Sequence, residues 1–264
     1  MADTGSLLLA EIDGYIARLT INRPEKRNAM TLSMWRALGD QLNDWAGNKQ
    51  VRVLILAGAG DKSFCAGNDI SEFPALRNTS EQRADYDAIT SCAYNALRTF
   101  PKPTIARIRG FCIGGGLELA QLCDLQIAAD TCEFAVTPAR IGIGYKLDDI
   151  LLLTSNISAK HAKEMLFTAA RFPSSEALRW GLINRVVSEN VLEKSVDALA
   201  SDIAANAPLS VAAAKAIVHE SVKEETLRDR ELCARLVVEC DTSKDRTEGQ
   251  SAFSEKRKPQ FTGR

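Results

Sequence analysis

The chain has 264 residues, of which 45% are hydrophobic and 25% are charged, and its formal net charge is −1. This composition supplies a packed core and excludes intrinsic disorder. Because the basic residues are dispersed, the sequence predicts no binding of nucleic acid or of an anionic membrane, and no apolar run is long enough to span a bilayer. We recognise no signal peptide and therefore expect a cytoplasmic protein.

With seven cysteines and two histidines, the chain has few candidate residues for disulfides or for metal ligands. The number of cysteines is odd and no CxxC motif occurs, so we predict buried, reduced thiols that pack as small hydrophobic side chains. His161 and His219 lie in helical patterns, and we expect both to stand outside any functional site. The sequence predicts no metal site.

The first half of the sequence alternates between strand and helix patterns. Apolar residues alternate in the predicted strands, whereas a period of 3.6 residues marks the helices. Thr31 is a capping residue for the first helix, and Gly47 closes it. In chain order we predict two strands within 6–24, a helix over 31–47, a strand over 51–60, a helix over 80–99, a strand over 101–110, a glycine-opened helix ending near 122, and strands over 125–130 and 132–137.

From Ser158 onward the sequence predicts helices only. Strands interleaved with helices, followed by helices alone, are typical of an α/β body with a helical appendage. We therefore expect a body over residues 1–190 and a helical region over 191–264. The predicted helices cover 158–168, 174–181, 190–205, 208–221 and 226–240.

Three consecutive glycines, at 114–116 in "FCIGGGLELA", open a helix that carries Glu118 in its first turn. The first N–H groups of a helix have no partner within it and attract an anion or a developing negative charge. A structural alternative is that the glycines allow tight helix–strand packing and that the acid favours the helix dipole. A phosphate loop is disfavoured because GxxxxGK[ST] is absent.

A second glycine-bearing loop, "AGAGDKSFCAGNDI", follows the predicted buried strand "VRVLIL". Ligands of α/β proteins commonly bind at the ends of such strands. Two loops that each offer backbone N–H groups could converge on one oxygen atom and form an oxyanion hole.

The stretches "NRPEKRNAM", "FCAGNDI", "GFCIGGGLELAQLCDLQIAAD", "FAVTPARIGIGY" and "EGQSAFSEKRKPQF" together resemble the crotonase superfamily, also called the enoyl-CoA hydratase/isomerase superfamily. The resemblance runs from about residue 8 to the C-terminus. It implies a spiral of ββα units whose C-terminal helices assemble a homotrimer or a dimer of trimers. It also implies an acyl-CoA thioester substrate, with coenzyme A entering as part of the substrate and no separate cofactor.

By this resemblance, the backbone N–H groups of Asn68 and Gly115 hold the thioester carbonyl and stabilise an enolate, while Glu118 acts as acid and base. Lys26, Arg27 and Ala29 correspond to a CoA-binding loop, for which the alternative is a solvated basic turn. Phe253 and Lys256 resemble positions that reach CoA on a neighbouring subunit, and an exposed helix end is the alternative. The other residues expected to contact the substrate are Ala66, Gly67, Asp69, Ile70, Gly114, Thr137 and Pro138.

The sequence departs from the hydratases of this superfamily at Pro138, where their second glutamate would stand. Tyr145, Asp148 or Asp149 could replace that carboxylate, although the two aspartates also suit a polar helix start. Tyr145, in a "TPxxxGxxY" pattern, and the "EKRKPxF" tail resemble the methylmalonyl-CoA decarboxylase subfamily, whereas a buried core tyrosine is the structural alternative. Asn68 stands where that subfamily has a histidine.

These observations lead to one preferred function and two alternatives. We expect an enoyl-CoA hydratase/isomerase-type enzyme in which Glu118 moves protons beside an oxyanion hole. A decarboxylase acting on methylmalonyl-CoA or a similar thioester would need the oxyanion hole but little acid–base help. A non-catalytic CoA-thioester binder or scaffold is disfavoured, because Glu118 and both loops are retained.

Overall fold

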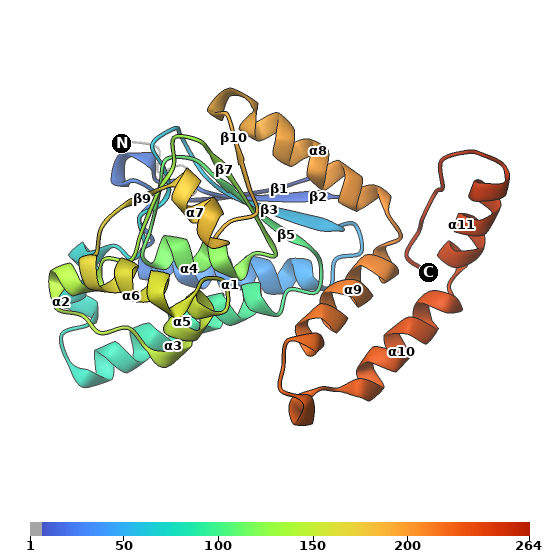
Figure 1. Cartoon of the computed structure of the whole chain (residues 1–264). Coiled ribbons are helices and arrows are strands. Elements are labelled where there is room, and N and C mark those ends of the chain that lie inside the picture. The colour runs from blue at the N-terminus through green and yellow to red at the C-terminus, as the bar shows by residue number, and fades with distance from the viewer. Residues whose placement is uncertain (1–6) are drawn as a thin grey trace.

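A twisted six-stranded sheet forms the centre of the molecule in the computed structural model, which describes residues 7–264 (Figure 1). The strands follow the order β1-β2-β3-β5-β7-β10, and all neighbours are parallel except the antiparallel pair β1 and β2. β3 is buried along nearly its whole length, as expected for a strand covered on both faces. The strands are β1 (Leu8–Asp13), β2 (Ile16–Ile21), β3 (Val53–Gly58), β5 (Thr104–Ile108), β7 (Leu125–Ala129) and β10 (Arg185–Val187).

A smaller four-stranded sheet runs beside the first and completes a repeating unit. Three times in succession, a strand of the large sheet is followed by a strand of the small sheet and then by a helix. This is the ββα spiral that the resemblance implies, and the α/β prediction is confirmed. The small sheet contains β4 (Ser63–Cys65), β6 (Phe111–Ile113), β8 (Glu133–Ala135) and β9 (Phe172–Pro173).

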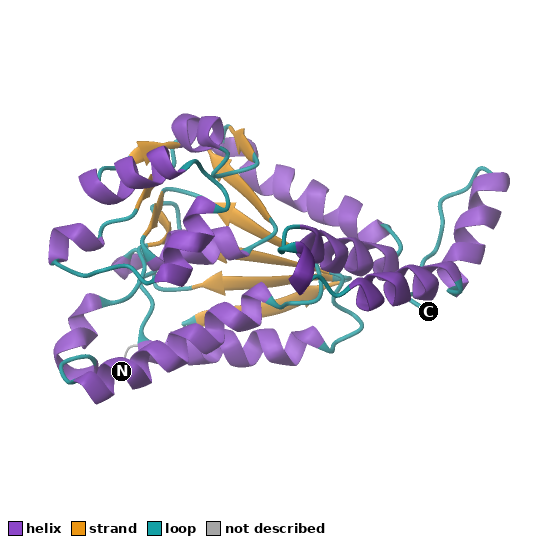
Figure 2. Ribbon diagram, turned by 60° about the horizontal axis from the view of Figure 1, so that its bottom comes forward, coloured by secondary structure: helices purple, strands orange, loops and turns teal. Residues whose placement is uncertain are grey.

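Helices cover both sides of the strands (Figure 2). The pair α1 and α3 packs closely together, and α4 is enclosed by α3, α5, β4 and β6. None of the helices in residues 7–264 is long and apolar enough to cross a membrane. The helices of this part are α1 (Leu32–Ala46), α2 (Phe73–Leu76), α3 (Ser80–Arg98), α4 (Gly115–Leu122), α5 (Leu147–Thr154), α6 (Ala159–Thr168) and α7 (Ser174–Trp180).

The C-terminal helices divide into one that packs on the sheet and three that extend from it. The helix α8 lies against β2, β3, β5 and β7 and buries Leu192, Val196, Ala200 and Ala204. The first helix after the predicted boundary at 190 thus packs on the body, and the boundary itself stays a prediction. The helix α8 covers Leu192–Ala205. The remaining helices project to one side (Figure 1), and they are α9 (Pro208–Ser221), α10 (Arg230–Asp241) and α11 (Lys244–Ser254).

Several expectations from the sequence are wrong in detail. The region after Ser158 is not purely helical, because β9 is a strand of the small sheet and β10 is a strand of the large sheet. The strands β4, β6, β9 and β10 have only two or three residues each, too few to show an alternating pattern, and α11 was not predicted.

The prediction of buried thiols holds for only part of the cysteines. Cys65, Cys112, Cys123 and Cys132 are buried, whereas Cys92 is exposed and the remaining two, 233 and 240, are half-buried. All seven are free. Burial in the apolar core raises the pKa of the Cys65 thiol to about 12, so this group stays protonated near neutral pH.

Candidate active site

The two glycine-bearing loops predicted from the sequence lie in direct contact. A Cβ atom on Gly67 would lie 3.0 Å from the backbone N of Gly115, and a Cβ on Gly116 would lie 2.1 Å from the carbonyl O of Cys65. Residues larger than glycine would therefore force the two backbones apart. The loop that carries Asn68 follows β4 and the loop that carries Gly115 follows β6, so adjacent parallel strands of the small sheet deliver both loops to the same place.

The backbone of Asn68 is fixed by a bridge to the segment that precedes α1. Met30 N donates to Gly67 O, and Asp69 N donates to Met30 O, each at 2.8 Å. Since successive N–H groups of an extended backbone point to opposite sides, the N–H of Asn68 faces away from Met30. It forms no hydrogen bond with other residues in the range 7–264.

The side chain of Asn68 is held from the opposite direction. Trp35 Nε1 donates to Asn68 Oδ1 at 2.8 Å, and Tyr86 Oη donates to the same oxygen at 3.3 Å. Trp35 and Tyr86 are themselves almost fully buried. These contacts restrict the rotation of Asn68 and keep its backbone in one orientation.

The glycine run opens α4, as the sequence predicts. Gly115 is the first residue of this helix, so its N–H has no partner within it, and no other residue of the described chain accepts from it. The helix is short but almost entirely buried beyond its first residue, which holds its N-terminal end in place. Gly115 and Asn68 therefore both present unpaired N–H groups beside the contact between the loops.

A cavity of about 380 Å³ opens over these two groups. It is large enough for a short acyl chain and part of a thioester arm. Most of the residues that the sequence assigns to the site line it, namely Ala66, Gly67, Asn68, Ile70, Gly114, Gly115, Glu118, Thr137, Pro138 and Tyr145.

Glu118 projects from the first turn of α4 and also lines this cavity. Burial raises the pKa of its carboxyl, and the negative charge of Asp149 raises it further. Hydrogen bonds from the Tyr94 and Tyr145 hydroxyls act in the opposite direction, because they favour the ionised carboxylate. A carboxyl whose pKa is moved toward neutrality suits proton transfer at physiological pH.

Tyr145 is thus placed at the site rather than in the apolar core, although it packs against the core along its ring. Asp148 and Asp149 both lie at the start of α5, and both line the cavity. Asp149 Oδ2 also accepts a hydrogen bond from Lys146 N at 3.2 Å, as a capping residue does. Desolvation raises the pKa of Asp149.

The remaining residues assigned from the sequence lie elsewhere. Asp69 does not line the cavity: a hydrogen bond from the Ser71 side chain and the ion pair with Arg23, at 2.6 Å, lower the pKa of its carboxyl to about 2. Lys26 and Arg27 are exposed on a turn, and the half-buried Ala29 follows them. This turn is joined to the loop that carries Asn68, since Ala66 N donates to Arg27 O at 3.1 Å.

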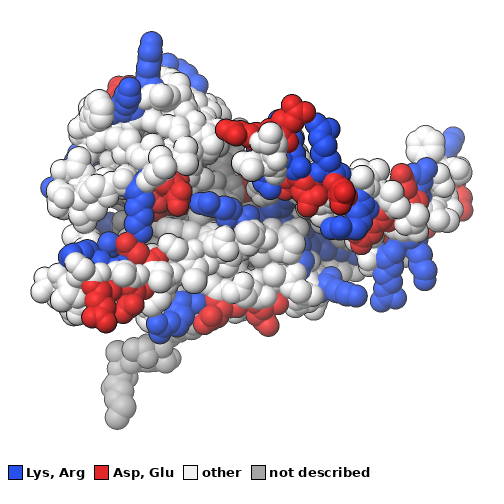
Figure 3. All heavy atoms as spheres, turned by 90° about the horizontal axis from the view of Figure 1, so that it is seen from below, with Lys and Arg blue, Asp and Glu red and all other residues white. Residues whose placement is uncertain are grey.

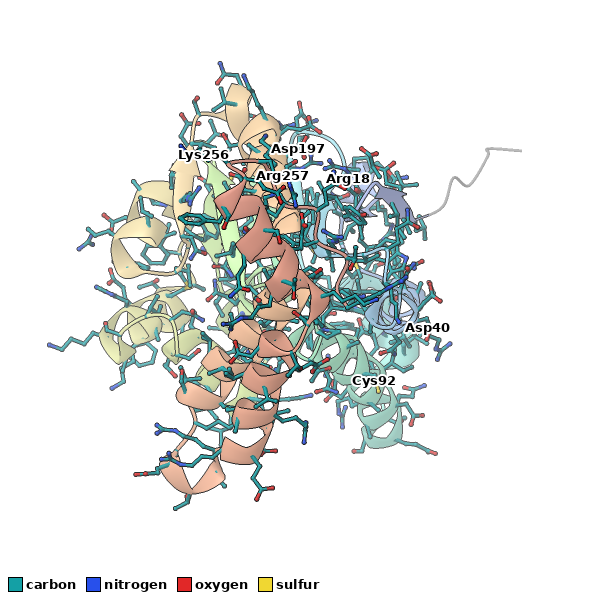
Figure 4. The ribbon with its side chains drawn as sticks, turned by 90° about the vertical axis from the view of Figure 1, so that its right-hand side faces the viewer. Arg18, Asp40, Cys92, Asp197, Lys256 and Arg257 are labelled. Atoms are coloured by element: carbon teal, nitrogen blue, oxygen red, sulfur yellow. The ribbon has the colours of Figure 1, made fainter. Side chains whose placement is uncertain are left out.

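Phe253 and Lys256 lie at the end of α11, outside the cavity of their own chain. Phe253 is 87% exposed, and Figure 4 shows Lys256 on the C-terminal segment at the outside of the molecule. The two histidines stay outside the cavity, as expected: His161 stacks on Trp180, and His219 is exposed in α9.

One wall of the cavity was missed by the sequence analysis. It comes from α3, where Thr90 and Tyr94 stand one helical turn apart on a single face. Tyr94 Oη would lie 2.9 Å from a Cβ atom on Gly115, and its ring packs edge-on against Trp35. Polar side chains at a spacing of four residues in an otherwise amphipathic helix were the available signal.

Two ion pairs centred on Asp87 join elements around the cavity. The Asp87 carboxylate lies 3.1 Å from Arg77, at the end of α2, and 2.9 Å from Lys146, at the start of α5. All three residues line the cavity. Figure 3 shows a hollow in the face that carries α3, with side chains of both signs around it.

Comparison with known proteins agrees with this geometry. Residues 11–264 match the enoyl-CoA hydratase/isomerase family. The short-chain-enoyl-CoA hydratase of Clostridium acetobutylicum is 32% identical over 95% of both chains, and the carnitinyl-CoA dehydratase of Proteus mirabilis is 35% identical over 95% of this chain and 96% of the other. A crystal structure of an enoyl-CoA hydratase/carnithine racemase from Magnetospirillum magneticum superimposes with a TM-score of 0.94, at 34% identity, covering 99% of this chain and 97% of that one.

The fold and the paired loops define an acyl-CoA-type site built on a ββα spiral. The chain belongs to the enoyl-CoA hydratase/isomerase family. The resemblance to this superfamily is therefore confirmed, whereas the resemblance to its decarboxylase subfamily finds no support in these comparisons.

Proposed function

We propose that this protein catalyses the hydration of short-chain enoyl-CoA thioesters. The observation that carries the proposal is the placement of Glu118 beside two unpaired backbone N–H groups, those of Asn68 and Gly115, in one cavity. Such N–H groups stabilise the enolate oxygen that forms when water adds to the double bond, and one donor typically contributes about 3–4 kcal/mol. The names of the relatives support the same reaction and the same class of substrate.

Coenzyme A binding is assigned to the turn at Lys26, Arg27 and Ala29. This turn is hydrogen bonded to the loop that carries Asn68, so a thioester held by Asn68 would extend its phosphate-bearing arm toward the two basic side chains. Coenzyme A enters as part of the substrate, and the proposed addition of water requires no redox step. We also assign the protein to the cytoplasm.

Assembly through residues 191–264 is part of the same proposal. Phe253 and Lys256 lie too far along the projecting segment to serve the cavity of their own chain, and in a homotrimer or a dimer of trimers they would reach coenzyme A on a neighbouring subunit. Exposed apolar side chains on the projecting helices support association, and they include Val218, Val222, Val237, Val238 and Phe253.

Purified protein with crotonyl-CoA, a 3-enoyl-CoA and methylmalonyl-CoA tests the reaction directly, with products identified by mass. We expect water addition to crotonyl-CoA. Glu118→Gln keeps the size of the side chain and removes the proton-transfer group, so the rate should fall by roughly 10²–10⁴-fold while thioester binding changes little.

Three outcomes would contradict the proposal or the role that it gives to Glu118. Carbon dioxide release from methylmalonyl-CoA without hydration of crotonyl-CoA would identify a decarboxylase. Thioester binding with no turnover of any of the three compounds would identify a non-catalytic binder. Nearly intact hydration in the Glu118→Gln variant would show that this carboxylate only favours the dipole of α4.

A further inference from the structure

A second, much smaller cavity lies behind Glu118. Its volume is about 10 Å³, which is the lower limit for holding one water molecule. The polar side chains around it are those of Glu118, Gln121, Tyr145 and Asp149, and the rest of its lining is apolar or glycine. A site of this size with several polar neighbours is suited to an ordered water.

Gln121 gives this cavity an unsatisfied acceptor. The side chain is only 7% exposed, and its Nε2 donates to Leu182 O at 2.7 Å. Its Oε1 is buried and has no hydrogen-bond partner among residues 7–264. A buried amide oxygen without a partner is destabilising, and a water in the cavity would donate to it.

Asp149 and Glu118 are the two carboxylates that face both cavities. Asp148 differs from its neighbour, because it is exposed and lines only the larger cavity. Pro138 stands where a second glutamate is expected, and the sequence left open whether Asp148 or Asp149 replaces it. The structure distinguishes between these two aspartates.

We propose that Asp149 is the second carboxylate of the site and that it exchanges a proton with Glu118 through one water molecule, bound in the small cavity by Gln121 Oε1. This inference rests on the proposed hydratase function. It makes Gln121 a positioning residue that acts through the water.

The proton balance of hydration explains why such a bridge is useful. The oxygen of the substrate water forms a bond to the β-carbon, one of its O–H bonds breaks, and that proton passes to the ionised carboxylate. The π electrons of the double bond move into the enolate, which takes a proton at the α-carbon from the protonated carboxylate. The pair gains one proton and loses one, so a transfer through the bridging water restores the starting arrangement.

The charged and titratable groups around Glu118 and Asp149 determine how removing the Asp149 charge would change the pH dependence of the rate. The negative charge of Asp149 raises the pKa of Glu118 and so raises the pH at which the pair loses its last proton, and the alkaline side of the pH–rate profile should move to lower pH when that charge is removed. Glu118 is faced by Tyr94, Cys65, Tyr145, Lys146 and Asp149, and Asp149 is faced by Lys146, Asp148, Asp87 and Glu118.

The test compares three variants in crotonyl-CoA hydration across the pH range. Asp149→Asn keeps an oxygen that can accept from Lys146 N, so the helix cap survives, and kcat should fall by roughly 10²-fold with little change in KM. Gln121→Met should lower kcat by less, because both carboxylates remain. Asp148→Asn is the comparison variant: it removes the neighbouring charge, but its side chain does not line the small cavity, so its kcat should fall by less than that of Asp149→Asn.

Circular dichroism and thermal unfolding establish that each variant is folded before rates are compared. Equal rates and pH profiles for Asp149→Asn and Asp148→Asn would overturn the role of Asp149. A loss in Asp149→Asn with a fully active Gln121→Met would overturn the bridging water. If the unchanged protein hydrates crotonyl-CoA and only these differences are absent, the proposed function stands and this inference fails. If the unchanged protein shows no hydration, both fail.

Discussion

The carboxyl of Glu118 couples activity to stability at the scale of a single residue. Because burial raises its pKa in the folded state above the ordinary value of 4.5, folding favours the protonated form. The contribution of protonated Glu118 to the free energy of unfolding is therefore fully present below the pKa that this group has in the unfolded chain, and it is lost as the pH rises through the pKa in the folded state. Glu118→Gln removes this dependence. We expect the melting temperature of the unchanged protein to decline relative to that of the variant as the pH rises above about 4.5, measured by calorimetry. Parallel melting curves would show that Glu118 ionises in the folded protein as it does in solution.

At the scale of secondary-structure elements, the close contact between the two loops can be tested at Gly116. Gly116→Ala would place a methyl group 2.1 Å from Cys65 O, so the start of α4 must move away from the loop that carries Asn68. We expect a loss of about 1–3 kcal/mol in the free energy of unfolding, measured with denaturant, and a lower kcat because the two N–H groups no longer converge. Gly47→Ala is the control, since no atom lies within 4 Å of the added carbon and the backbone is right-handed there. If Gly116→Ala is as stable and as active as this control, close packing against Cys65 does not explain why a glycine stands at position 116.

At the scale of the whole molecule, the projecting helices predict an assembly. Val222 is 79% exposed and Leu227 is 67% exposed, and both lie where α9 turns toward α10. Apolar surface of this kind on protruding elements marks an interaction site. We expect light scattering to give about three or six times the 28.8 kDa mass of the chain, and a combined Val222→Asp and Leu227→Asp variant to give smaller species. Leu178→Asp, at an exposed position of α7, should leave the mass unchanged. A monomeric unchanged protein would contradict the proposed assembly.

The amino-acid sequence by itself determined the α/β class, the longer helices and strands, and the two loops of the site. These features depend on local signals, such as the helical period after Thr31, the buried strand before Gly58 and the glycine run before Glu118. Most of the assigned site residues meet in one cavity because the loops follow neighbouring strands of a parallel sheet.

Only the tertiary structure decided which distant side chains complete the two cavities. Tyr94 lies outside the quoted motifs, and the motif that contains Gln121 assigns it no role; both side chains reach the cavities because α3 and α4 pack beside the loops. The choice between Asp148 and Asp149 was open for the same reason. Adjacent residues of a helix point about 100° apart, and only the packing of α5 against α4 shows which one faces Glu118. The packing of α8 on the sheet and the short strand β10 also depend on contacts with residues far away in the chain, which no local pattern records.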